Sequence, residues 1–450
     1  MQALVTHVAI LLLLPAGLLT IWFEYRRRRA LTPILLLTIG NLAYFAVNPY
    51  LFLVSPSDAE YFAYLVSLMN ELTFEGVASL LLAAFAFQLG LLGVSLTTRR
   101  QSMVSLQGSR NGEGLISAKA LTYLGIADVV VGLIGMVWMG IIYNGTPFGL
   151  YRLSYAEHGT FFHGASVPAF LLDVGKYGAS LLMAVAVLDR RPVRVAVVFL
   201  AMTLHGVALK SKLPIFHIAC VYAVAQSLSG APNKMRALIP LGLAGLVIGA
   251  LGILRGAEDI FAIPRFFDDN REVVMRSVSS PWENDFPGPA AAAYIVVNDP
   301  YQEWSMGPLW DVVTYFVPKF VVDRGLSVSE LYSKRLLGSG WQPGLGPGWS
   351  LISDGYLMLG QTGVVLVGAF VGWLGRRVDQ LRASNDDLRA ECGRVFVCVS
   401  SPLFLFAPRA ALASLLKVLL VVWVVSILPV LAADLLQRSR GVTTSRPARV

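Results

Sequence analysis

The chain has 450 residues, of which 56% are hydrophobic and only 14% are charged, and its formal net charge is +8. This composition excludes an ordinary soluble enzyme and predicts an all-α polytopic membrane protein. Its three cysteines offer neither a disulfide framework nor a zinc-ligand spacing, and its arginines are divided among short segments between apolar runs, which excludes a nucleic-acid groove.

Hydropathy predicts about eleven transmembrane helices. The first covers residues 4–23 and precedes the basic block Arg26 to Arg29. Because a signal peptide carries its charge before the apolar run, we expect a retained helix with its N-terminus outside. The other predicted spans are 30–54, 73–96, 121–143, 168–188, 195–209, 213–230, 237–254, 350–375, 395–408 and 411–433.

The distribution of basic residues predicts the orientation of these helices. Alternating the spans places 22 of the 36 Lys and Arg residues on the side of the Arg26 block. An excess of this kind marks the cytoplasmic side. We therefore expect a periplasmic N-terminus and a cytoplasmic C-terminus.

Four regions follow from this topology. Residues 1–254 hold the first eight transmembrane helices, 255–349 form one large extracytoplasmic loop, 350–437 hold the last three helices, and 438–450 form a basic cytoplasmic tail. The apolar patches 289–297 and 309–322 of the loop are too short to span, so we expect interfacial or re-entrant helices there. The cytoplasmic segment 378–394 carries mixed charge and is expected to be a solvated helical connector.

A loop rich in glycine, proline and tryptophan, residues 338–349, runs directly into the ninth predicted helix. Trp341 and Trp349 are side chains typical of a bilayer interface. From Ser350 onward, helical spacing places Ser350, Asp354, Leu357 and Gln361 along one stripe. A carboxylate at this depth is costly unless it meets a wet cavity or a partner, so Asp354 is either a functional group or a structural polar contact.

Cations on the predicted outer side need a separate explanation, because the excess of Lys and Arg that orients a membrane protein lies on the cytoplasmic side. Arginine presents a planar fork that matches phosphate oxygens, so a lipid diphosphate suits them; pairing with acids of the same loop is the alternative. Arg152, Arg276 and Arg409 are the strongest candidates. Lys210, in the turn before the seventh helix, suits either lipid headgroups or substrate.

Three stretches resemble the oligosaccharide repeat-unit polymerases, the Wzy family of O-antigen and exopolysaccharide polymerases. They are Lys210-Ser211-Lys212 opening a span, Tyr315-Phe316-Val317-Pro318-Lys319 in the large loop, and Gly348-Trp349-Ser350 with Asp354, Tyr356, Gly360 and Gly363. Arg409 resembles a basic residue that begins a late span of the family. One departure is Asp354, which stands where the family is expected to have Glu.

The resemblance implies a glycosyltransferase of the bacterial inner membrane that joins polyprenyl-diphosphate-linked oligosaccharides at the outer face. The assigned diphosphate ligands are Arg152, Arg276 and Arg409, with Arg255, Arg324 and Lys210 in reserve. His163 or His158 is the candidate base, with Asp354 as a competitor. No metal or cofactor is expected. Membrane lipids and a chain-length regulator are the other expected partners, and nucleic acid is not one.

Two other functions stay open. An O-antigen ligase has the same layout and differs in its acceptor. A transporter or flippase of lipid-linked glycans would use intramembrane ionisable residues such as Asp128, Asp173 and Lys176, of which the last two are spaced to pair across one helical turn. His205 and His217 lie within spans and are expected to pack between helices.

Overall fold

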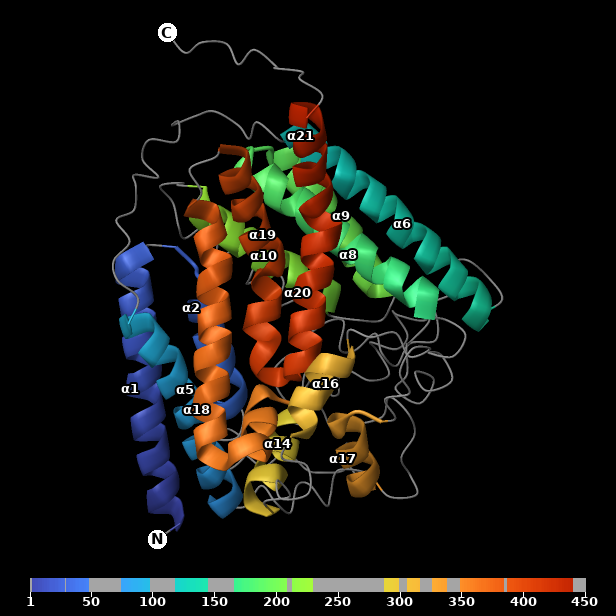
Figure 1. Cartoon of the computed structure of the whole chain (residues 1–450). Coiled ribbons are helices and arrows are strands. Elements are labelled where there is room, and N and C mark those ends of the chain that lie inside the picture. The colour runs from blue at the N-terminus through green and yellow to red at the C-terminus, as the bar shows by residue number, and fades with distance from the viewer. Residues whose placement is uncertain are drawn as a thin grey trace, which may run out of the picture.

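The computed structural model describes residues 2–28, 30–47, 74–97, 118–144, 166–208, 213–229, 287–298, 306–315, 326–337, 349–383 and 387–439. Every regular element within these ranges is a helix (Figure 1), in agreement with the predicted all-α class. Six of the described helices are long and apolar enough to cross a membrane, and four shorter apolar helices accompany them. The fold is therefore that of a helical membrane protein.

Ten of the eleven predicted spans overlap described helices, and span 237–254 lies outside the described residues. The helices are α1 (Gln2–Arg28), α2 (Pro33–Leu42), α5 (Phe74–Thr97), α6 (Ala118–Asn144), α8 (Ser166–Leu188), α9 (Pro192–Ala208), α10 (Leu213–Leu228), α14 (Pro287–Asn298), α16 (Gly307–Tyr315), α17 (Val328–Leu337), α18 (Leu351–Gln380), α19 (Asp387–Phe406), α20 (Leu412–Ser426) and α21 (Leu428–Ser439). Short π and 3₁₀ segments, η1 (Ala43–Val47), η6 (Leu381–Ala383) and η7 (Ala407–Arg409), extend α2, α18 and α19.

A buried polar network holds α1, α2 and α5 together. The amide of Gln88 donates to Thr20 Oγ1 at 2.9 Å and to Thr38 Oγ1 at 3.3 Å. Asn41 Nδ2 donates back to Gln88 Oε1 at 3.2 Å. Since lipid offers no hydrogen-bond partner, such bonds between helices fix the register of the three helices.

Glycines bring α6 and α8 into close contact, and α6 slants along α8 at one side of the bundle (Figure 1). A methyl group on Gly132 would overlap the Cα of Gly175, and one on Gly178 would overlap Asp128 Cβ. Small residues at such crossings allow the two backbones to approach closely, as is typical of helix pairs in membranes.

A tight turn joins α8 to α9. Arg190 has φ 57°, in the left-handed region. The Arg191 N–H donates to Ala186 O at 2.8 Å, and the Arg190 N–H donates to Val187 O at 3.1 Å. This is the Schellman pattern, which satisfies carbonyl groups at the end of α8. It allows α9 to begin only a few residues after α8 ends.

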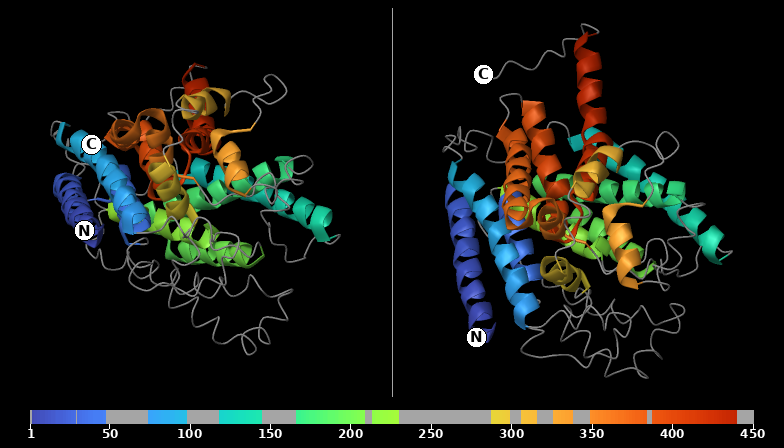
Figure 2. Two further views of the ribbon diagram at one scale, coloured as in Figure 1. Left: turned by 90° about the horizontal axis from the view of Figure 1, so that it is seen from below. Right: turned by 60° about the horizontal axis from the view of Figure 1, so that its bottom comes forward.

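The three short helices of the segment predicted to form the large loop, α14, α16 and α17, lie together at the end of the bundle where α1 and α18 begin (Figures 1 and 2). We call this end of the bundle, defined by residues 287–337 and the starts of α1 and α18, the loop end. The chain's last helix, α21, extends away from the opposite end. The apolar patch of α14 is packed on protein, because Ala292, Ala293 and Ile295 are fully buried.

The ninth predicted helix is broken. Inside α18, Leu359 (φ −150°, ψ 30°) and Gly360 (φ 59°, ψ −143°) leave helical geometry. The expected stripe through Asp354 and Gln361 is therefore wrong beyond the break: Gln361 belongs to the second segment and is exposed, whereas Asp354 is buried. Gly360 supplies the positive φ that other residues adopt rarely.

In the described part of the segment 378–394, the expectation of a solvated connector is wrong for Asp379, Arg382 and Glu391, which are buried, whereas Arg389 is exposed. Asp379 and Arg382 are both buried, and Arg382 Nε lies 2.9 Å from Asp379 Oδ1. One turn earlier, buried Arg376 forms an ion pair with Glu24 of α1. The charges at this end of the bundle thus form ion pairs both within the α18–η6 segment and between α18 and α1. Charges that pair with one another can be buried where single charges cannot.

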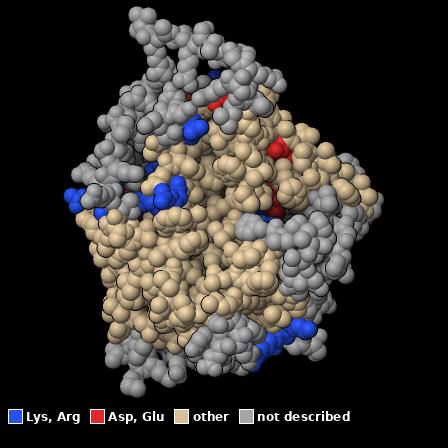
Figure 3. Space-filling model, in the orientation of Figure 1, with Lys and Arg blue, Asp and Glu red and all other residues tan. Residues whose placement is uncertain are grey.

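The face shown in Figure 3 has a broad surface without described charged residues. Lys and Arg lie over the upper half of this face and at its lower edge, on either side of that surface. Along this middle region α18 exposes Leu366, Phe370 and Trp373. An exposed apolar belt between charged ends is the surface expected of a chain that spans a membrane.

Candidate functional site

Asp354 occupies the first turn of α18 and is buried. Its Oδ1 accepts a hydrogen bond from the indole Nε1 of Trp349 at 2.6 Å. Its Oδ2 accepts one from the backbone N–H of Leu412 at 2.6 Å. The carboxylate therefore links the start of α18 to the start of α20.

This bond supplies a cap that α20 lacks in its own sequence. The N-cap residue Ala411 has no side chain able to accept a hydrogen bond. The first N–H groups of a helix need acceptors and favour negative charge, so Asp354, from a helix distant in sequence, meets both needs. Both of its oxygens are engaged, an arrangement that favours a positioning role over that of a base.

Arg409 lies three residues before Leu412, in η7 between α19 and α20. Its guanidinium carbon is 5.8 Å from the centroid of the Tyr44 ring of η1, a cation–π geometry. Tyr44 also packs on Phe406, with ring centroids 6.4 Å apart. Arg409 is half-buried where η1, α19 and α20 meet.

Helices of the large loop build an aromatic wall beside Asp354. The Tyr332 ring of α17 lies 5.3 Å from Trp349 and 5.8 Å from Tyr294 of α14. Trp349 is only 7% exposed, so the expectation that it lies at the lipid interface is wrong. Its indole instead orients the carboxylate, and Trp341 lies outside the described residues.

The structure brings together two of the site residues that the sequence analysis named, Asp354 and Arg409, through the bond to Leu412. The other named residues lie outside the described residues: Arg152, Arg276, Arg255, Arg324, Lys210, His158 and His163. The predicted pairing of Asp173 with Lys176 is confirmed, with Lys176 Nζ 2.7 Å from Asp173 Oδ1.

Sequence reasoning missed the surroundings of His217. Its ring packs edge-on against Tyr177, with centroids 5.8 Å apart, and it is only 4% exposed. Its Nε2 is buried without a hydrogen-bond partner among the described residues. One feature of the sequence could have predicted this arrangement. His217 lies five residues after Lys212, near the start of its predicted span, and another predicted span carries Asp173 and Lys176.

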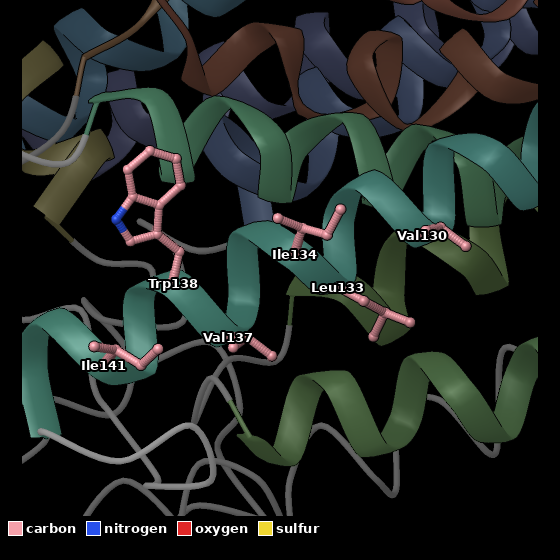
Figure 4. Close-up of a pocket in the computed structure, with 6 residues that line it drawn as sticks. All are labelled: Val130, Leu133, Ile134, Val137, Trp138 and Ile141. Carbon is pink, nitrogen blue, oxygen red and sulfur yellow. The ribbon is translucent and has the colours of Figure 1, made fainter.

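An apolar groove of about 460 Å³ lies along α6 (Figure 4). It is lined by Val130, Leu133, Ile134, Val137, Trp138 and Ile141, all from this one helix. Since these side chains offer no charged group to orient a polar substrate, the groove fits lipid chains and is not a candidate for the reaction.

No protein-family model, curated protein or solved structure matches this chain. A fold of packed membrane helices does not by itself indicate an activity. The assignment of function therefore depends on the residues at the loop end and on the motifs of the sequence.

Proposed function

We propose that this chain is a metal-independent polymerase of lipid-diphosphate-linked oligosaccharide repeat units. In the proposed reaction, the bond between the anomeric carbon of the growing glycan and its polyprenyl diphosphate breaks. A new bond forms from that carbon to a sugar hydroxyl of the incoming unit, whose proton passes to a base. Polyprenyl diphosphate leaves with the electrons of the broken bond.

The observation that carries the proposal is the way Arg409 is held. A permanent cation stands at the loop end, against Tyr44, immediately before the helix start that Asp354 caps. A guanidinium held in advance stabilises negative charge as it develops on a leaving diphosphate, without reorganisation during the reaction. Arginine also keeps its charge at any working pH.

The remaining roles stay as the sequence suggests them. Arg152 and Arg276 are the partners of Arg409 at the diphosphates, and His163 or His158 is the base that accepts the hydroxyl proton. Asp354 enters the proposal as a positioning residue for Arg409, because its two oxygens already accept hydrogen bonds.

The proposed orientation puts the loop end in the periplasm of a bacterial inner membrane. Support comes from the basic residues, which the sequence concentrates on the side of Arg26 to Arg29, at the opposite end of α1. The test is a cysteine introduced by Gly164→Cys: in intact cells it reacts with an impermeant thiol reagent, whereas Lys119→Cys reacts only after lysis. The reverse pattern would overturn the orientation.

Purified protein with its lipid-linked repeat unit tests the activity directly. A polymerase yields a ladder of products, and Arg409→Ala or Arg276→Ala abolishes the ladder while the protein still inserts. Arg377→Ala is the matched control, because this arginine lies over Trp373, 5.4 Å from its ring centroid, in the last turn of α18. Full polymerisation by both outer variants would refute the proposed diphosphate contacts.

One observation favours a second candidate, a transporter or flippase of lipid-linked glycans. The described membrane helices contain the Asp173–Lys176 pair and, on α6, a buried Asp128 whose Oδ2 has no hydrogen-bond partner among the described residues. Such residues are common along ion paths. A transporter moves the lipid-linked unit across a vesicle membrane unchanged. An O-antigen ligase transfers a finished glycan once to a different acceptor. Neither produces a ladder of products from repeat units alone.

A further inference from the structure

Three helices place ionisable side chains around the α9–α10 region, away from Arg409 and Asp354. Lys176 and Tyr177 come from α8, His205 from α9 and His217 from α10. Lys176 Nζ lies 4.8 Å from the Tyr177 ring centroid, and the His217 ring packs against Tyr177 with centroids 5.8 Å apart. We call Lys176, Tyr177 and His217 the α8–α10 cluster.

Helix lengths explain why these residues meet. Lys176 lies twelve residues before the end of α8 and His205 thirteen residues after the start of α9, on either side of the tight Schellman turn. At 1.5 Å per residue, both stand roughly 18–20 Å from that turn. The two residues therefore lie at similar distances from the turn, on two helices that pack against each other.

The cluster lies near the middle of α8. Lys176 is the eleventh of the 23 residues of this helix. Tyr177 follows it, and His217 is the fifth residue of α10. A charge at this depth in a helix long enough to cross a membrane is costly unless it has a partner or faces a wet cavity.

In this cluster, Nε2 of His217 has no hydrogen-bond partner among the described residues. A buried polar atom without a hydrogen bond is costly, so an unpaired Nε2 in a native structure calls for a ligand or another explanation. Next to it, Lys176 pairs with Asp173, whose side chain is 57% exposed. The ammonium carries three N–H donors, and Asp173 accepts from one of them, so the group can also donate to an anion.

A row of three aromatic rings, from Phe216, Phe406 and Tyr44, lies between the cluster and Arg409. Phe216, adjacent to His217, packs on Phe406 with ring centroids 5.0 Å apart. Phe406 in turn packs on Tyr44, over which Arg409 lies. The fold therefore places Lys176 on one side of these three rings and Arg409 on the other.

We propose that the α8–α10 cluster is a second diphosphate-binding site, which takes the headgroup of the second lipid-linked substrate. This inference rests on the proposed polymerase function, since joining two lipid-diphosphate-linked glycans requires two diphosphates to be held at once. Lys176 supplies the charge, and the Tyr177 hydroxyl and His217 Nε2–H donate to phosphate oxygens. Arg409 serves the other diphosphate.

The test counts ligands bound to the full-length protein in nanodiscs of zwitterionic lipid. The probe is polyprenyl diphosphate without a glycan, which cannot be polymerised, and native mass spectrometry gives the number bound. We expect two per chain in the unmodified protein, one in Lys176→Met, one in Arg409→Gln and none in the double variant. Lys176→Arg keeps the charge and retains two, as does Lys119→Met, a lysine at the start of α6.

His217→Leu provides a second variant, since it fills the same space without a donor. It is expected to lose one ligand and to retain the one that depends on Arg409, and the retained ligand shows that the protein is folded. A single ligand in the unmodified protein, lost in Arg409→Gln and unchanged in Lys176→Met, would overturn the second site and leave the polymerase proposal intact. Absence of any bound probe would refute both proposals.

Ordinary phospholipid is the competing source of the same phosphate chemistry. The count is therefore repeated in nanodiscs that contain phosphatidylglycerol. A second ligand that persists supports the site for lipid diphosphate. Its displacement by phosphatidylglycerol, with the Arg409-dependent ligand retained, would show a general headgroup site and overturn the inference.

Discussion

Replacing Asp354 by leucine removes the link between α18 and α20 at nearly constant volume. Two donors then lose their acceptor inside the protein: the indole N–H of Trp349 and the backbone N–H of Leu412, each at 2.6 Å in the native structure. An unsatisfied buried donor costs about 1–3 kcal/mol, so the variant should lose about 2–6 kcal/mol of unfolding free energy. Asp354→Asn retains one acceptor and should lose about half as much.

Reversible unfolding in mixed micelles of detergent and dodecyl sulfate measures this loss. Trp349→Phe provides the internal control, because it removes the indole donor while keeping an aromatic ring against Tyr332. In the double variant with Asp354→Leu only the Leu412 donor is left unsatisfied. The double variant should therefore be less destabilised than the sum of the two single variants.

The same substitution should also impair polymerisation, because Arg409 lies three residues before the freed N–H of Leu412. We expect a loss of product ladder in Asp354→Leu and partial activity in Asp354→Asn. Unchanged stability in Asp354→Leu, or additive effects in the double variant, would refute the capping argument. Full activity together with the expected loss of stability would refute only the positioning of Arg409.

Two further predictions concern packing and buried charge. Gly132→Ala should destabilise the protein by about 1–3 kcal/mol through overpacking against Gly175. Gly93→Ala, where nothing lies within 4 Å of the added methyl, should not, and equal losses in micelle unfolding would contradict the close contact. Arg376→Met should cost about 3–5 kcal/mol by leaving Glu24 buried without its partner. The double variant with Glu24→Gln should recover most of that loss, and a double variant as unstable as Arg376→Met would contradict the pairing.

Local patterns of the sequence were sufficient for much of the fold. A run of apolar residues must form a helix in lipid, because every backbone N–H and C=O must be satisfied within the segment. Ten of the predicted spans therefore coincide with described helices. The Asp173–Lys176 pair was predictable for the same reason, since residues three apart on one helix are neighbours whatever surrounds them.

The errors share a cause. Polarity alone predicts that Trp349 lies at an interface and that Asp379 and Arg382 face water. In the structure these three residues are buried, because Asp354 accepts the indole N–H of Trp349 and Arg382 pairs with Asp379. Beside them, Arg376 pairs with Glu24 across more than three hundred residues of sequence. No local pattern contains such a partner.

The sequence by itself thus determined that this is a helical membrane protein and where most of its helices lie, because those properties depend on the transfer of each segment into lipid. Tertiary structure alone decided that Asp354 caps α20, that Arg409 lies against Tyr44, and that Nε2 of His217 has no hydrogen-bond partner among the described residues. These features depend on which distant helix ends meet, and that is set by packing between helices, including the glycine contact of α6 with α8.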